Sequence, residues 1–178
     1  SNFTIIYEGF ITYGGMAGRD MAALAQGLDE ATEFPYLESR ISQVELLGNL
    51  LIEYGIPVQK PIGGHAVFLD ALKFLPNIKR EEFPAQTLAL EIYKEAGIRG
   101  VEIGTILADR DPETRENRYP KLELVRLALP RRTYTDNHIR YIAAALKNVF
   151  DRRDEITKGY KVTWESEILR HLTVKLEQ

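Results

Sequence analysis

The chain has 178 residues, which suits one domain or one domain plus a piece of another. With 44% hydrophobic and 28% charged residues and a formal net charge of −3, it has the composition of a soluble globular protein and does not favour nucleic acid as a partner. The lack of cysteine excludes disulfides, thiolate metal sites and cysteine nucleophiles. No signal peptide and no membrane span of roughly 18 apolar residues is visible, so we expect a cytoplasmic protein.

The chain opens with Ser1-Asn2, without a Met, and passes at once into an apolar, β-rich segment at 3–7 that is typical of a buried strand. This abrupt start favours a cut made by cloning over a processed natural N-terminus. Four glycines between Gly9 and Gly18 then predict a turn, and a first helix is expected from near Ala17.

Predicted helices and strands alternate along the rest of the chain. Apolar periodicity, proline at helix starts and glycine at helix ends predict helices from Pro35 to about Gly55, from Pro84 to Gly97, and from an N-cap at Thr135 through Val149. Strands are expected at 65–69, 101–107, 122–129, 160–164 and 171–176, and a long mobile loop at 108–121. The pattern predicts an α/β fold whose mixed, partly antiparallel sheet is covered by helices.

Residues 13–20 form a glycine-rich turn between a strand and a helix, a place where backbone N–H groups can meet a phosphate. The turn matches neither the Walker loop nor the dinucleotide fingerprint. A tight turn that simply starts a helix is the favoured interpretation.

Arg126 is the most informative single residue. Period-2 alternation in 122–129 puts it on the same strand face as Leu122, Leu124 and Ala128. A guanidinium on an apolar face is costly unless it is paired, and its fork suits a bidentate carboxylate. An internal ion pair, or an edge strand that faces water, would explain the pattern equally well.

The histidines and lysines predict less. His65, His138 and His171 are scattered and have no carboxylate at ligand spacing, so no metal site is expected. Alternation places His171 on the polar face of the last strand. All nine lysines lie in polar or amphipathic surroundings typical of a surface, so none is suited to a Schiff base.

Five segments, in order along the chain, resemble the β-eliminating lyases, the family of tryptophanases and tyrosine phenol-lyases. They are Tyr7-Glu8-Gly9, Tyr13 to Met21, Pro61 to Ala71, Glu82 to Gln86, and Val125 to Arg131.

The resemblance implies a fold-type-I pyridoxal-phosphate enzyme, similar to aspartate aminotransferase, with an active site between two domains and beside a neighbouring subunit. Residues 1–33 would end the large cofactor-binding domain, and residues 34–178 would form the small α+β domain. The family's cofactor lysine lies in a Ser-Gly-Lys-Lys motif that this sequence lacks. We therefore expect it upstream, together with the ligands of a potassium ion.

Site residues also follow from the resemblance. Arg126 matches the arginine that binds the substrate's α-carboxylate. Ile103 falls where tyrosine-cleaving members have an arginine, and His171 where tryptophan-cleaving members have a histidine. Tyr13 and Gly14 are expected near the cofactor of the partner subunit.

The resemblance thus implies a homotetrameric lyase that splits L-tryptophan, or a related amino acid, into indole, pyruvate and ammonia. The chain alone is expected to be inactive. Tyrosine phenol-lyase activity, or a non-catalytic binding or oligomerisation module that reuses this domain, are the alternatives.

Overall fold

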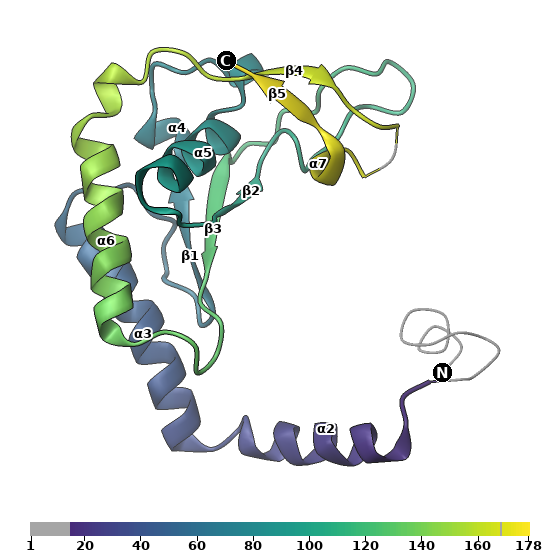
Figure 1. The fold of residues 1–178 in the computed structure, drawn as a ribbon, viewed down its shortest axis with the longest axis vertical. Coiled ribbons are helices and arrows are strands. Elements are labelled where there is room, and N and C mark those ends of the chain that lie inside the picture. Colours follow the sequence, from purple (N-terminus) through teal and green to yellow (C-terminus); the bar gives the residue numbers. More distant parts are fainter. Residues whose placement is uncertain (1–14, 168) are drawn as a thin grey trace. The chain divides into compact units, whose positions relative to one another are not determined.

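The computed structural model describes residues 15–167 and 169–178. Helices, short 3-10 helices (η) and strands follow one another along the chain (Figure 1). Their bounds are α2 Gly18–Glu30, α3 Phe34–Glu53, β1 Ala66–Asp70, α4 Ala71–Phe74, η1 Arg80–Glu82, α5 Pro84–Ala96, β2 Val101–Ile103, β3 Leu124–Ala128, α6 Asp136–Asp151, η2 Arg153–Glu155, β4 Lys161–Trp164, α7 Arg170–Thr173 and β5 Lys175–Glu177.

The chain divides into two units, Ser1–Arg40 and Ile41–Gln178. The boundary falls inside α3, and the domain boundary expected after residue 33 stays a prediction. Within the first unit, α2 begins after Ala17, as predicted, and buries none of its residues. The strand expected at 3–7 lies outside the described residues.

The second unit is built on a three-stranded antiparallel sheet in the order β1-β3-β2. Strand β3 is central: Phe68 of β1 and Val101 of β2 both pair with Arg126. A two-stranded antiparallel sheet, β4-β5, follows. The α/β arrangement with antiparallel strands is confirmed, and no parallel pair occurs among the described residues.

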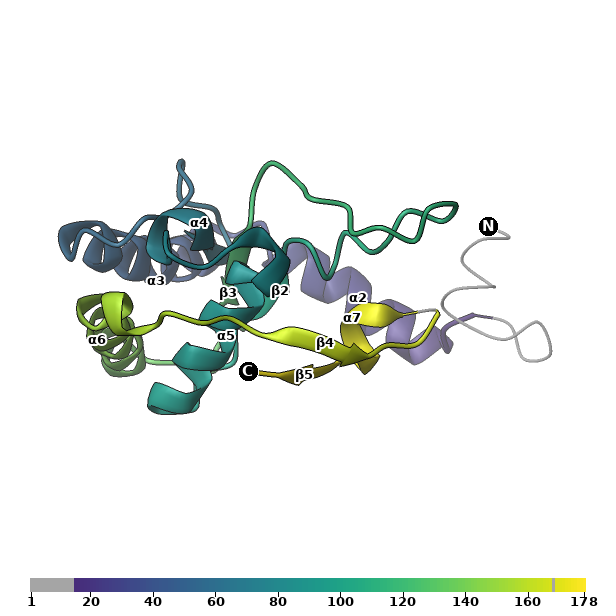
Figure 2. The ribbon, with the colours of Figure 1, turned by 90° about the horizontal axis from the view of Figure 1, so that it is seen from above.

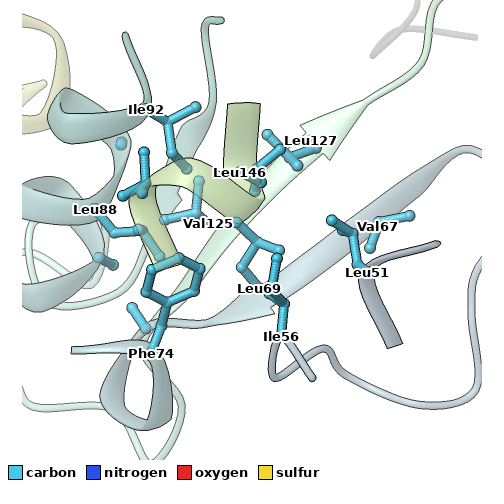
Figure 3. Packing of buried hydrophobic residues seen from close by; sticks show 14 of the residues in the cluster. Leu51, Ile56, Val67, Leu69, Phe74, Leu88, Ile92, Val125, Leu127 and Leu146 are labelled. Atoms are coloured by element: carbon cyan, nitrogen blue, oxygen red, sulfur yellow. The ribbon is translucent and has the colours of Figure 1, made fainter. Parts of the chain in front are cut away.

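One face of the three-stranded sheet carries the core. Side chains at Val67 and Leu69 in β1 and at Val125 and Leu127 in β3 are 5% exposed or less, because α5 and α6 cover this face (Figure 2). Figure 3 shows the resulting cluster, to which the helices and the segment after α3 contribute Leu51, Ile56, Phe74, Leu88, Ile92 and Leu146. The opposite face, which carries Arg126, is less buried.

Local signals in the sequence set several helix ends correctly. Pro84 is the first residue of α5, and Gly97 ends that helix with a left-handed φ of 67°. Thr135 caps α6 as predicted, and the Thr135 N–H donates to Nδ1 of His138 at 3.1 Å. No helix in the part of the chain that the structure describes is long and apolar enough to cross a membrane.

Two predicted strands are wrong in part. The strand expected at 101–107 ends at Ile103, because the N–H groups that follow turn toward buried carboxylates. The strand expected at 171–176 is the short helix α7 followed by β5, so His171 lies on a helix. Leu169 has a left-handed φ of 54°, and the Thr173 hydroxyl bonds back to the Leu169 carbonyl at 3.3 Å, which closes the helical turn.

Candidate functional site

Arg126 lies on the middle strand of the sheet, half buried, on the face opposite the core. Its direct neighbours across the two flanking strands are Phe68 and Val101. Because cross-strand partners project from the same face, the guanidinium stem lies between two apolar side chains. The predicted alternation of β3 is confirmed, although Leu122 precedes the strand and is 50% exposed.

The structure distinguishes between the three explanations of Arg126. Strand β3 is not an edge strand, so the arginine does not simply face water there. No ion pair of Arg126 is found among the described residues, and its Nε is buried without a hydrogen-bond partner. A desolvated, unsatisfied donor of this kind is costly, and an external carboxylate would relieve that cost.

Ile103 projects from the same face of the sheet as Arg126. It pairs with Leu124, which lies two residues before Arg126 in β3, so the two candidates are diagonal neighbours. Ile103 is half buried. Its aliphatic side chain offers a ligand an apolar contact and no hydrogen-bond donor.

His171 lies in a different place, in a cavity of about 470 Å³ at the free edge of β2. The cavity is lined by residues of α5, of β2, of the turn after β2 and of α7, among them Tyr93, Val101, Leu107 and His171. Arg126 and Ile103 do not line this cavity. Val101 connects the two places, because it lines the cavity and is also the cross-strand partner of Arg126.

Helix α7 is held by a cluster of two arginines and one acid. Arg170, only 1% exposed, pairs through Nε with Glu165 at 2.6 Å, and Arg110 pairs with the other oxygen of the same carboxylate. All three guanidinium nitrogens of Arg170 are buried without a hydrogen-bond partner among the described residues, so Glu165 holds Arg170 as an ion pair. Burial by itself raises the pKa of Glu165, but Arg110 and Arg170 together hold that pKa below its usual range. His171 directly follows the buried Arg170 in α7.

The turn after β2 is held by two buried acids. Glu102 accepts the N–H of Ile106 on one oxygen, at 3.0 Å, and the N–H of Leu107 on the other, at 2.9 Å. Glu123 accepts both the N–H and the hydroxyl of Thr105 on a single oxygen. Burial raises the pKa of Glu102, and the neighbouring Glu123 adds to the rise, while the bonded N–H groups oppose it.

Sequence reasoning missed this acid pair, although a signal was present. Glu123 alternates with Val125 and Leu127, so it precedes β3 on the buried side of the chain. Glu123, like Arg126, is a charged residue that alternation puts in line with apolar side chains, and it is completely buried.

The remaining candidates do not join this site. Tyr13 and Gly14 lie outside the described residues. His138 caps α6, and His65 precedes β1 at the surface. All nine lysines are exposed except Lys147, which is half buried and pairs with Asp151. The described residues therefore do not fit the covalent anchor of pyridoxal phosphate.

Comparison with known proteins supplies the family. Residues 12–145 match the sequence profile described as "Beta-eliminating lyase". A probable beta-eliminating lyase of Trichomonas vaginalis is 67% identical over 99% of this chain and 39% of its own length. Tyrosine phenol-lyases of Nostoc punctiforme and Symbiobacterium thermophilum are 49% and 50% identical, over 99% and 97% of this chain and 38% of their own lengths.

The chain thus spans less than two-fifths of the relatives that it matches. The profile covers most of the sheet unit as well as α2, α3 and the half-buried Arg126, so the match and the geometry concern the same part of the molecule. The chain belongs to the β-eliminating lyase family of pyridoxal-phosphate-dependent enzymes.

Proposed function

We propose that this chain is the substrate-binding part of a pyridoxal-phosphate-dependent lyase that removes the aromatic side chain from an L-amino acid. The observation that carries the proposal is Arg126, whose buried Nε has no hydrogen-bond partner among the described residues. In this role Arg126 binds the α-carboxylate and orients the substrate. The cofactor, when bound, supplies the electron sink for bond cleavage, and its lysine is provided by another part of the protein.

Two substrates compete within this proposal. The relatives near 50% identity favour L-tyrosine, because they are tyrosine phenol-lyases. The chain's own residues favour L-tryptophan. Ile103 offers no donor to a phenol oxygen, and His171 falls where tryptophan-cleaving members of the family have a histidine. A homotetramer and a potassium requirement belong to the same proposal.

Substrate choice is tested by incubating the complete protein with each amino acid and measuring indole and phenol release. If Ile103 and His171 decide the substrate, kcat/KM is higher for L-tryptophan, and Ile103→Arg shifts the ratio toward L-tyrosine. A higher kcat/KM for L-tyrosine in the unaltered protein would assign it to the branch that its relatives' names indicate.

The role of Arg126 is tested in the same assay. Arg126→Ala removes a buried charged contact to the carboxylate, so KM should rise by the equivalent of about 2–5 kcal/mol. Arg140→Ala, on the exposed side of α6, is the matched control and should leave KM as it was. A KM unchanged in Arg126→Ala would remove this residue from the site.

The 178-residue chain alone should release neither indole nor phenol when pyridoxal phosphate is added, because none of its lysines is buried. Product above background would contradict this expectation. If the complete protein is also inactive and has no cofactor lysine, the chain is instead a binding or oligomerisation module.

A further inference from the structure

The turn after β2 forms one wall of the cavity that contains His171. Ile106 and Leu107 line the cavity, as does Glu102 at the start of the turn. The three N–H groups that fix this turn, those of Thr105, Ile106 and Leu107, all bond to the carboxylates of Glu102 and Glu123. The position of the wall therefore depends on these two acids.

Gly104 shows how closely the two carboxylates approach the turn. A Cβ at this position would collide with Oε2 of Glu123 and would lie 2.8 Å from Oε1 of Glu102. Both acids thus fill the space in which a side chain of residue 104 would stand. No cation joins them among the described residues, so the backbone N–H groups and the Thr105 hydroxyl are their partners.

We infer that Glu102 and Glu123 are positioning residues that set the wall against which the substrate's aromatic side chain packs, an inference that rests on the proposed function. They act through the turn, and the turn determines where Ile106 and Leu107 stand relative to His171.

The two acids are not equivalent, and this makes the inference testable. Glu102 uses both oxygens as acceptors, so an amide at this position would direct an NH2 group at a backbone N–H. Glu123 uses only Oε1, while Oε2 is buried and has no partner. A glutamine at 123 can therefore place its NH2 group at Oε2 and donate toward Glu102.

The experiment compares four variants of the complete protein, E102Q, E123A, E123Q and E91Q, in the product-release assay. KM for the aromatic amino acid should rise about tenfold in E102Q and E123A, which corresponds to about 1.4 kcal/mol. E123Q should restore KM to within about threefold of the unaltered protein. Glu91 is a buried acid on α5 that pairs with Lys94 and Arg152 outside the cavity, so E91Q is the matched control and should leave KM unchanged.

A second probe separates positioning from general loosening of the fold. L-Alanine has the α-amino and α-carboxylate groups of the substrate but no aromatic side chain. Its inhibition constant should therefore be the same in E102Q as in the unaltered protein. Hydrogen exchange should be faster at the N–H groups of Ile106 and Leu107 in E102Q, and unchanged there in E91Q.

Contrary results would point to different failures. If E102Q and E91Q raise KM alike, or if L-alanine binding weakens as much as substrate binding, the acids are only structural and the inference is wrong. An E123Q variant as impaired as E123A would overturn it too. If the unaltered protein releases neither indole nor phenol, the proposed function itself fails, and the inference falls with it.

Discussion

Two clusters of charged side chains hold elements that line the His171 cavity. Cations outnumber carboxylates in one cluster, and the other contains carboxylates alone. Beside α7, the carboxylate of Glu165 forms ion pairs with two guanidinium groups, those of Arg110 and the buried Arg170. Beside β2, two carboxylates, Glu102 and Glu123, share no cation and are held by backbone N–H groups and one hydroxyl.

The two walls of this cavity are therefore fixed by different kinds of interaction. The α7 wall depends on ion pairing, in which a buried charge requires its partner. The β2 wall depends on hydrogen bonds from the backbone to two carboxylates, and burial raises the pKa of one of them, Glu102. Acid should therefore weaken the first wall and strengthen the second.

The largest effect is expected from Glu165→Ala. This change leaves Arg170 buried without a counter-ion, and breaking a buried pair from one side costs about 3–5 kcal/mol. Urea unfolding of the chain should show a loss of that order. A loss below about 1 kcal/mol would mean that Arg170 is satisfied by water, and that the α7 wall is not fixed by ion pairing.

A smaller loss is expected from Gly104→Ala in the β2 wall. The added methyl group must displace two buried carboxylates, and overpacking of this kind costs about 1–3 kcal/mol. Gly64→Ala is the matched control, since a Cβ there meets nothing within 4 Å, and it should change the free energy of unfolding little. Equal effects in the two variants would show that the acid pair is not closely packed around the turn.

The pH dependence of stability should differ in sign between the clusters. The pKa of Glu165 is lowered in the folded chain, so its contribution is present above the ordinary value near 4.5 and is lost as the pH falls through the folded pKa. The pKa of Glu102 is raised, so its contribution is present below 4.5 and is lost as the pH rises through the folded pKa. Unfolding curves from pH 3 to pH 8 for Glu165→Gln and Glu102→Gln should each lack one of these two slopes.

The smallest effect is expected at the surface pair of Lys147 and Asp151, 2.5 Å apart at helical i,i+4 spacing. Asp151→Ala should cost only about 0.3–0.5 kcal/mol, because both partners are accessible to water. A loss as large as that of Glu165→Ala, about 3–5 kcal/mol, would mean that burial does not distinguish the Arg170 pair from an exposed pair.

The sequence allowed much of the fold to be predicted where local chemistry decides the structure. Pro84, Gly97 and Thr135 set helix ends because their φ angles and capping groups act within one turn. Alternation in β3 placed Arg126 on the right face, although it did not reveal that this face is the more open one. The strand expected at 171–176 failed because Arg170 must be buried against Glu165, a tertiary requirement that overrides the apolar alternation of Leu172, Val174 and Leu176.

The candidate site was predictable only in part for the same reason. Alternation singled out Arg126 and the family resemblance singled out Ile103, but that the two lie together depends on the pairing of β2 with β3, which the sequence did not predict. That His171 lies in a separate cavity with Val101 depends on α7, which the alternation did not predict. The partners of Glu102 are N–H groups that become available only when the chain turns away from β2, so nothing in the local pattern signals them.

The anchoring of the turn after β2 also determines where the chain can accept inserted residues. The loop that follows this turn is attached at two places. Arg110 forms an ion pair with Glu165 and an isolated β-bridge with Asn117, and the Pro120 carbonyl accepts a hydrogen bond from Arg80. The tip between these attachments, at 112–116, is exposed. Because doubling the length of a flexible loop costs only about 0.6 kcal/mol, insertions at this tip should be tolerated by the fold, and it is a suitable place to introduce a label or a reporter segment.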